Sequence, residues 1–239
     1  MQLPEDVRRV VDSLVSSARD AFDEKLRSVI LYGSGAEGRL RATSDVNLLF
    51  VLTQFDSSAD SFREPYRSAQ AAANVAAMFV LDSELGDAAE AFAQKFADIG
   101  RRHVVLYGDD VVSRLRIPRE ALKRRVRQVL LNLTMRLREA YVERSLRAEQ
   151  CAIVVADATG PLRTSAVSIL ELEGEEPLPP KEALEAVASG LAQRELADVL
   201  PRLSEARERR VLPAGESAAI LFDTLELARA LYDRASRLS

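Results

Sequence analysis

The chain has 239 residues, which is room for one large domain or two small ones, and 47% hydrophobic residues supply ample core material. With 29% charged residues and a net charge of −4, the composition is that of an ordinary globular protein. The charged N-terminal residues lack the apolar region of a signal peptide, and no apolar run approaches the ~18 residues of a membrane span. One cysteine, Cys151, excludes an internal disulfide framework. We therefore expect a cytoplasmic protein without a membrane partner.

The charges are spread unevenly along the chain. Residues 113–147 hold eleven Lys or Arg against three Glu, a local net charge of +8, which leaves −12 for the remainder. Such asymmetry is typical of an anion-binding face, and a solvated helix face fits the same pattern. The sequence has no Cys/His zinc pattern, so any metal must be held by oxygen ligands, which favours magnesium or manganese.

Helical and strand patterns alternate in the first half of the chain. Apolar residues such as Val7, Val11 and Leu14 recur with helical spacing over residues 5–26. Short β-branched runs bounded by glycine or polar residues indicate strands. We expect strands at 28–33, 45–52, 75–81 and 103–108, and further helices at 63–74 and 83–98.

After Gly108 the pattern is helical throughout. Pro118 suits the first turn of a helix, and an apolar stripe then continues to about Arg144. The predicted fold class is α+β, with a small mixed β-sheet domain over residues 1–112 followed by a C-terminal α-helical bundle over residues 113–239. The stripe is formed by Leu122, Val126, Val129, Leu133, Leu137 and Ala140, and the other expected helices span 147–158, 161–173, 181–190, 193–208 and 216–236.

The segment from Ser28 to Leu52 combines groups that bind phosphate. Gly33-Ser34 follows a buried strand, where glycine lets the backbone approach a ligand and the serine hydroxyl and nearby N–H groups bind an anion. Gly38, Arg39 and Arg41 add flexibility and positive charge to the same loop.

The next strand brings polar groups beside this loop. Asp45 and Asn47 are two residues apart on a strand, so they project to the same face while Val46 and Leu48 point to the core. Two adjacent acids in these positions would hold divalent cations against a triphosphate during phosphoryl transfer. Here the second position is an asparagine.

The run Gly33-Ser34-Gly35-Ala36-Glu37-Gly38-Arg39, followed by Ser44-Asp45-Val46-Asn47-Leu48-Leu49, resembles the nucleotidyltransferase superfamily that includes DNA polymerase β. Relatives of similar size are the kanamycin-type aminoglycoside nucleotidyltransferases and the minimal nucleotidyltransferases. The resemblance implies transfer of a nucleoside monophosphate from a nucleoside triphosphate to a hydroxyl, with magnesium as cofactor and pyrophosphate as product. It also implies that Ser34 touches the nucleotide phosphates, together with the loop residues Gly33, Gly38, Arg39 and Arg41, and that Asp45 is the catalytic carboxylate, with Asp45 and Asn47 as metal ligands.

The sequence departs from the family pattern at the metal site. Asn47 offers a neutral carbonyl oxygen in place of a carboxylate, and the strand at 75–81, where the family's third carboxylate usually lies, contains no acid. Asp82, at the end of that strand, is the nearest candidate for a third acid, and Asp98 is a more remote one. Each lost charge is expected to cost several kcal/mol of metal binding, as an order of magnitude. We therefore expect weak magnesium binding or none.

Three functional readings remain open from the sequence. The first is an active magnesium-dependent nucleotidyltransferase that acts on a small-molecule or protein hydroxyl. The second is a protein that binds the nucleotide with reduced or lost transfer, or a non-catalytic regulator that binds a partner. The third is an unrelated α/β protein. We do not expect nucleic acid as the acceptor, because no separate template-binding domain remains. A monomer and a homodimer both fit the sequence.

Several other residues carry groups that can take part in function. His103 is the one histidine and flanks a strand, so a structural role competes with that of a general base. Cys151 lies in an apolar segment and is best read as a core residue. Tyr32 either packs in the core or lines the site, and Glu139 and Glu143 remain open as bases for an acceptor hydroxyl.

Overall fold

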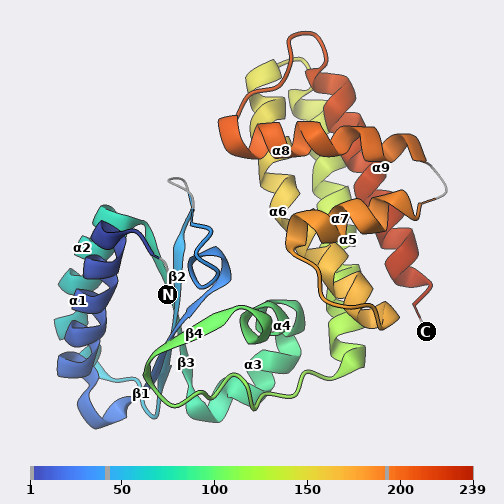
Figure 1. The fold of residues 1–239 in the computed structure, drawn as a ribbon. Helices are drawn as coiled ribbons and strands as arrows, with labels where there is room; N and C mark the ends of the chain where they lie inside the picture. Colours follow the sequence, from blue (N-terminus) through green and yellow to red (C-terminus); the bar gives the residue numbers. More distant parts are fainter. Residues whose placement is uncertain (1–2, 41–43, 192–193, 239) are drawn as a thin grey trace. The chain divides into compact units, whose positions relative to one another are not determined.

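The computed structural model describes residues 3–40, 44–191 and 194–238 of the chain (Figure 1). The chain divides into two compact units, Met1–Ile117 and Pro118–Ser239. The first unit contains the sheet, and the second is formed by helices.

A four-stranded mixed sheet, in the spatial order β3-β2-β1-β4, organises the first unit. β1 (Leu26–Tyr32) pairs antiparallel with β2 (Val46–Leu52) and with β4 (His103–Gly108). β3 (Val75–Leu81) runs parallel to β2. The predicted strands are confirmed: β3 and β4 have the predicted bounds, while β1 begins two residues earlier than expected and β2 one residue later.

Two helices, α1 (Glu5–Phe22) and α2 (Arg63–Ala73), cover one face of this sheet (Figure 1). α1 is four residues shorter than predicted, because Asp23 has a positive φ of 45° and a 3-10 turn then leads into β1. The core on this side contains an aromatic cluster in which Phe50 stacks on Phe79, with ring centroids 5.0 Å apart. The strand residues of this core are Val29, Leu31, Val46, Leu48, Phe50, Leu52 and Val75.

The opposite face of the sheet is covered by α3 (Leu85–Ala91) and α4 (Ala93–Arg101). The sequence predicted one helix over 83–98, but the chain leaves helical geometry at Phe92, with φ −113° and ψ 39°. The break lets α4 turn onto the sheet. Its buried residues Phe96 and Ile99 pack in one core with Ile30, Tyr32, Leu49 and Val51 of the sheet.

The second unit is a helical bundle, as predicted. Its longest helices are α5 (Arg119–Arg144), α6 (Ala148–Glu173) and α9 (Ser217–Ser236), which contact one another. On α5 the fully buried positions include Leu130 and Thr134, whereas the predicted stripe residues Val129 and Leu133 are only half-buried. The remaining elements are α7 (Pro180–Ser189), a 3-10 segment (Arg194–Val199) and α8 (Leu200–Arg209).

The prediction of two helices over 147–158 and 161–173 is wrong, because α6 is continuous through Pro161. Residues on both sides of the proline, including Thr159 and Leu162, are fully buried, and this packing outweighs the lost backbone hydrogen bond. By length and composition α6 is apolar enough to cross a membrane, and two thirds of its apolar window is buried inside the structure. Cys151, at the start of α6, is buried with its Sγ 3.3 Å from the carbonyl oxygen of Arg144, in agreement with a core role.

Candidate functional site

The loop after β1 forms a compact turn. Gly33 has a φ of +75°, and its N–H donates to the carbonyl oxygen of Arg102 at 2.9 Å. A 3-10 turn over Gly33–Gly35 follows, and the Arg39 N–H closes the loop by donating to the Ser34 carbonyl oxygen at 2.9 Å. The first N–H groups of such a turn have no acceptor within it, so the Ser34 segment is suited to bind an anion.

This loop is tied to α4 by an ion-pair network that the sequence did not reveal. The guanidinium of Arg102 donates to both carboxylate oxygens of Asp98, at 3.0 and 2.5 Å, and to Glu37 in the loop at 3.0 Å. Burial lowers the pKa of Arg102, but the hydrogen bonds with the two acids outweigh it, so its pKa lies above the ordinary value. Arg102 therefore fixes the predicted phosphate loop to the helix.

Of the two arginines predicted for the loop, Arg39 lies within the described residues and Arg41 does not. Arg39 is exposed at the end of the turn, and Gly38 has a φ of +70°, which favours glycine there. Arg41 lies outside the described residues, so its prediction stays untested.

Asp45 and Asn47 lie together at the start of β2, as their spacing predicted. The Oδ1 atom of the exposed Asp45 accepts a hydrogen bond from Nδ2 of Asn74 at 2.5 Å. Nδ2 of Asn47 donates to the backbone carbonyl of Asp45 at 3.2 Å, a bond that an aspartate in its place could not make. The Asp45 carboxylate is thus held by the side-chain amide of Asn74, and the Asn47 amide is held by the backbone of Asp45.

The strand register defines the surface beside these groups. Asn47 pairs with Tyr32 of β1 and with Ala76 of β3, and Tyr32 pairs with His103 of β4. Residues directly opposite one another in a sheet point to the same face. The row that crosses the sheet at this point is therefore Ala76, Asn47, Tyr32 and His103, on the face covered by α3 and α4.

This arrangement does not fit a two-metal site. Asp45 is the carboxylate of the predicted pair, and the place next to Asn47 on β3 is taken by Ala76. Asp82 is wrong as a candidate for the third acid: because β3 runs parallel to β2, Asp82 lies at the opposite end of the strands, about 20 Å away at ~3.3 Å per residue, and pairs with Arg27. Asp98 is on the correct face but is held by Arg102. Over residues 3–40, 44–191 and 194–238, no three His, Cys, Asp or Glu residues form a group that could hold a metal ion.

Tyr32 lies at the centre of the cross-sheet row and is 8% exposed. Burial raises the pKa of its phenol to about 12, and the charges of Asp98 and Asp45 add to the effect. The ammonium of Lys95, on α4, lies over the Tyr32 ring at 5.8 Å from its centroid. The tyrosine thus both packs in the core and borders the site.

His103 has a structural environment. Its Nε2 lies 3.2 Å from Oδ1 of Asp110, and its Nδ1 lies 3.2 Å from the carbonyl oxygen of Gly100. Hydrogen bonds from Ser113, and then the contact with His103, lower the pKa of Asp110 to about 2. Both ring nitrogens are engaged, which favours a role in holding the β4 segment over that of a general base.

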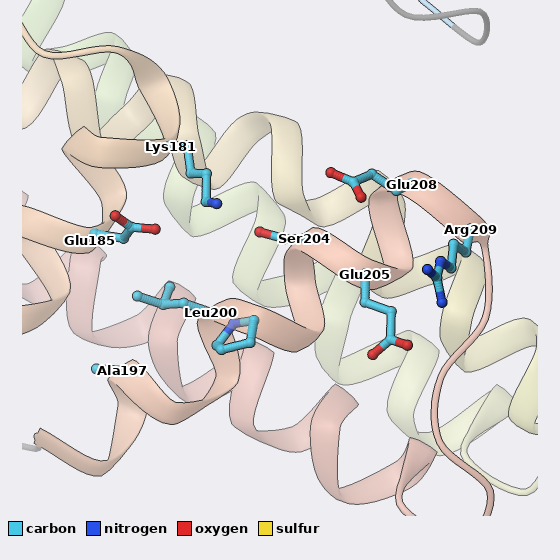
Figure 2. A pocket seen from close by; sticks show the side chains of 9 residues that line it. Lys181, Glu185, Ala197, Leu200, Ser204, Glu205, Glu208 and Arg209 are labelled. Atoms are coloured by element: carbon cyan, nitrogen blue, oxygen red, sulfur yellow. The ribbon is translucent and has the colours of Figure 1, made fainter.

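A concave surface lies in the helical unit. A groove of about 600 Å³ is bordered by α7 and α8, and Figure 2 shows Lys181 and Glu185 on one side of it, with Ser204 and Glu208 on the other. Its carboxylates and cations are mixed, and it contains none of the residues predicted for the nucleotide site. The candidate bases Glu139 and Glu143 are exposed on α5, and neither lines this groove.

Comparison with known proteins identifies the fold. No family model matches the chain, and no curated protein matches it by sequence. A solved structure does match: spectinomycin adenyltransferase AAD(9) from Enterococcus faecialis, with ATP and spectinomycin, at a TM-score of 0.63 and 15% identity over 94% of this chain and 98% of that one. The likeness covers both units and confirms the nucleotidyltransferase fold with its C-terminal helical bundle.

Proposed function

We propose that this chain, which has the nucleotidyltransferase fold, binds a nucleoside triphosphate on the α3/α4 face of its sheet and has reduced or lost transfer of the nucleoside monophosphate. The triphosphate would lie against the Gly33–Gly35 turn, with the Ser34 hydroxyl and the N–H groups of Ser34 and Gly35 as donors, since the Gly33 N–H already donates to Arg102. Arg39 adds positive charge at the end of the same loop.

One observation carries the proposal: the row Ala76, Asn47, Tyr32 and His103 borders a phosphate-type turn but supplies no carboxylate. Phosphoryl transfer by two divalent ions needs carboxylates that neutralise both ions and fix their separation. With Asp45 alone at the head of β2, the metal affinity falls while the donors for the phosphates remain. Binding without efficient transfer is the expected result.

A second candidate is an active magnesium-dependent nucleotidyltransferase that modifies a small-molecule hydroxyl. The observation in its favour is that the structurally similar adenyltransferase was solved with ATP and spectinomycin and matches this chain over both units. In that case Asp45 would be the essential carboxylate, with Asn47 as a weaker second ligand. We expect either activity in a reducing cytoplasm.

The two candidates are separated by one set of titrations. ATP, GTP, CTP and UTP are titrated calorimetrically, each with and without magnesium, and pyrophosphate release is measured on the same samples. Under our proposal, at least one triphosphate binds and pyrophosphate release is absent or very slow. Release that disappears in Asp45→Ala would support the second candidate instead.

A pair of serine variants tests where the triphosphate lies. Ser34→Ala removes one hydroxyl donor and should weaken triphosphate binding about fivefold, the equivalent of about 1 kcal/mol. Ser68→Ala, on α2 at the other face of the sheet, makes the same chemical change and should have no effect. Equal affinities for the two variants would contradict binding at the turn.

A further inference from the structure

A lysine lies beside the depleted part of the site. Lys95 is exposed on α4, and its ammonium lies over the ring of Tyr32, the direct cross-strand neighbour of Asn47. Within the described residues, no carboxylate pairs with this ammonium. The lysine therefore places a positive charge beside the row where the nucleotidyltransferase pattern would have metal-bound carboxylates.

The two arginines at the C-terminal end of α4, Arg101 and Arg102, are engaged by carboxylates. Arg102 is held by Asp98 and Glu37, and Arg101 lies 3.8 Å from Asp98. These contacts neutralise both carboxylates that approach the face from α4 and from the loop. The ammonium of Lys95 thus keeps its charge available for an anionic ligand.

The contact with Tyr32 holds the lysine in place. An ammonium over an aromatic face is attracted by the negative face of the ring, which favours one position of a flexible side chain. Because burial raises the pKa of Tyr32 to about 12, its phenol is neutral at physiological pH and does not form an ion pair with Lys95. The ammonium keeps its three N–H donors free to turn toward phosphate oxygens.

We propose that Lys95 replaces the divalent cation in this fold, so that the site binds the triphosphate without metal. The proposal rests on the nucleotide binding proposed above and adds the residue that neutralises the phosphates. It agrees with the residues present: Asn47 and Ala76 remove the negative charges that would attract magnesium, and Lys95 supplies a positive charge that magnesium would otherwise bring.

ATP is the probe for the test, titrated into the full chain in EDTA and then in magnesium. The native chain should bind ATP with affinities that agree within about threefold in the two buffers. Lys95→Gln should weaken binding in EDTA by about ten- to a hundredfold, the range for a hydrogen bond to a charged group, whereas Lys95→Arg should stay within about threefold of the native chain. Arg67→Gln is the matched control. It removes one cation from a 77% exposed position on α2, on the opposite face of the sheet, and should leave the affinity for ATP nearly unchanged.

The outcomes separate this inference from the function on which it rests. If Lys95→Gln and Arg67→Gln bind ATP equally well in EDTA, the lysine has no such role. If the native chain binds ATP only with magnesium, the inference is wrong while the proposed nucleotide binding stands. If no triphosphate binds in either buffer, both are wrong. Far-UV circular dichroism of Lys95→Gln should match the native chain, because the side chain is exposed.

Discussion

Replacement of Arg102 by alanine should destabilise the first unit far more than loss of a surface ion pair. The guanidinium makes three charge-assisted hydrogen bonds, two to Asp98 and one to Glu37, and the three side chains are only 17–26% exposed. Breaking a fully buried pair costs about 3–5 kcal/mol, because the remaining charge has no partner. Since water still reaches these groups in part, we expect a loss of about 2–3 kcal/mol in the free energy of unfolding.

The matched control for this prediction is Arg63→Ala. Arg63 approaches Asp60 at 2.6 Å, a short contact, but the two side chains are 74% and 60% exposed. Exposed pairs contribute about 0–1 kcal/mol, so this variant should lose no more than that. The shortest contact is nearly the same in the two pairs, 2.5 Å for Arg102–Asp98 and 2.6 Å for Arg63–Asp60, whereas the number of hydrogen bonds and the burial separate them.

Urea unfolding followed by far-UV circular dichroism gives both values. A second readout is amide hydrogen exchange in residues 33–40, which should accelerate in Arg102→Ala because the loop loses its contact through Glu37. Arg102→Lys keeps the charge but loses the two-pronged geometry, so its free energy of unfolding should lie between those of the native chain and the alanine variant. Equal losses in Arg102→Ala and Arg63→Ala, with unchanged exchange in the loop, would refute the reasoning.

Three further predictions concern other positions. Gly108→Ala should destabilise the chain by several kcal/mol, because φ is +77° and a Cβ would overlap the backbone carbonyl oxygen of Arg27 on the neighbouring strand. Gly86→Ala is the control: its Cβ would meet open space on α3, so it should be neutral or slightly stabilising. Thermal unfolding compares the two variants. The phenol of Tyr32 holds its proton more tightly in the folded chain (pKa about 12) than in the unfolded chain (about 10), so the free energy of unfolding should fall as the pH rises from 10 to 12. Ultraviolet titration at the phenolate band should show one tyrosine that ionises at higher pH than the others, and Tyr32→Phe should remove that step. The double variant Asn47→Asp/Ala76→Glu places two more carboxylates beside Asp45, so ATP binding should become dependent on magnesium, as calorimetry in EDTA and in magnesium would show.

Most of the fold follows from local patterns in the sequence. β3 and β4 match their predicted bounds, because a short apolar run flanked by polar or turn residues leaves few alternatives. The continuity of α6 through Pro161 could not be predicted in this way, since it depends on burial of the residues around the proline by other helices. Local propensity was outweighed there by tertiary packing.

The residues of the candidate site that are close in sequence could be predicted together, whereas those brought in by strand pairing could not. Ser34, Asp45 and Asn47 belong to one continuous motif, whereas Ala76 joins them only through the parallel register of β3, which no local pattern specifies. The same register explains why the prediction of Asp82 as a third acid is wrong. The contacts of Lys95 and Arg102 were also missed. The four-residue spacing of Asp98 and Arg102 was an available signal for that pair, whereas the approach of Lys95 to Tyr32 depends on how α4 packs on the sheet.

Metal-independent nucleotide binding without transfer is tested by titrating ATP into the native chain in EDTA and in magnesium, with pyrophosphate measured in the same samples. We expect binding of similar affinity in the two buffers and no pyrophosphate above the background of ATP alone. Binding that requires magnesium, accompanied by pyrophosphate release that Asp45→Ala abolishes, would contradict it.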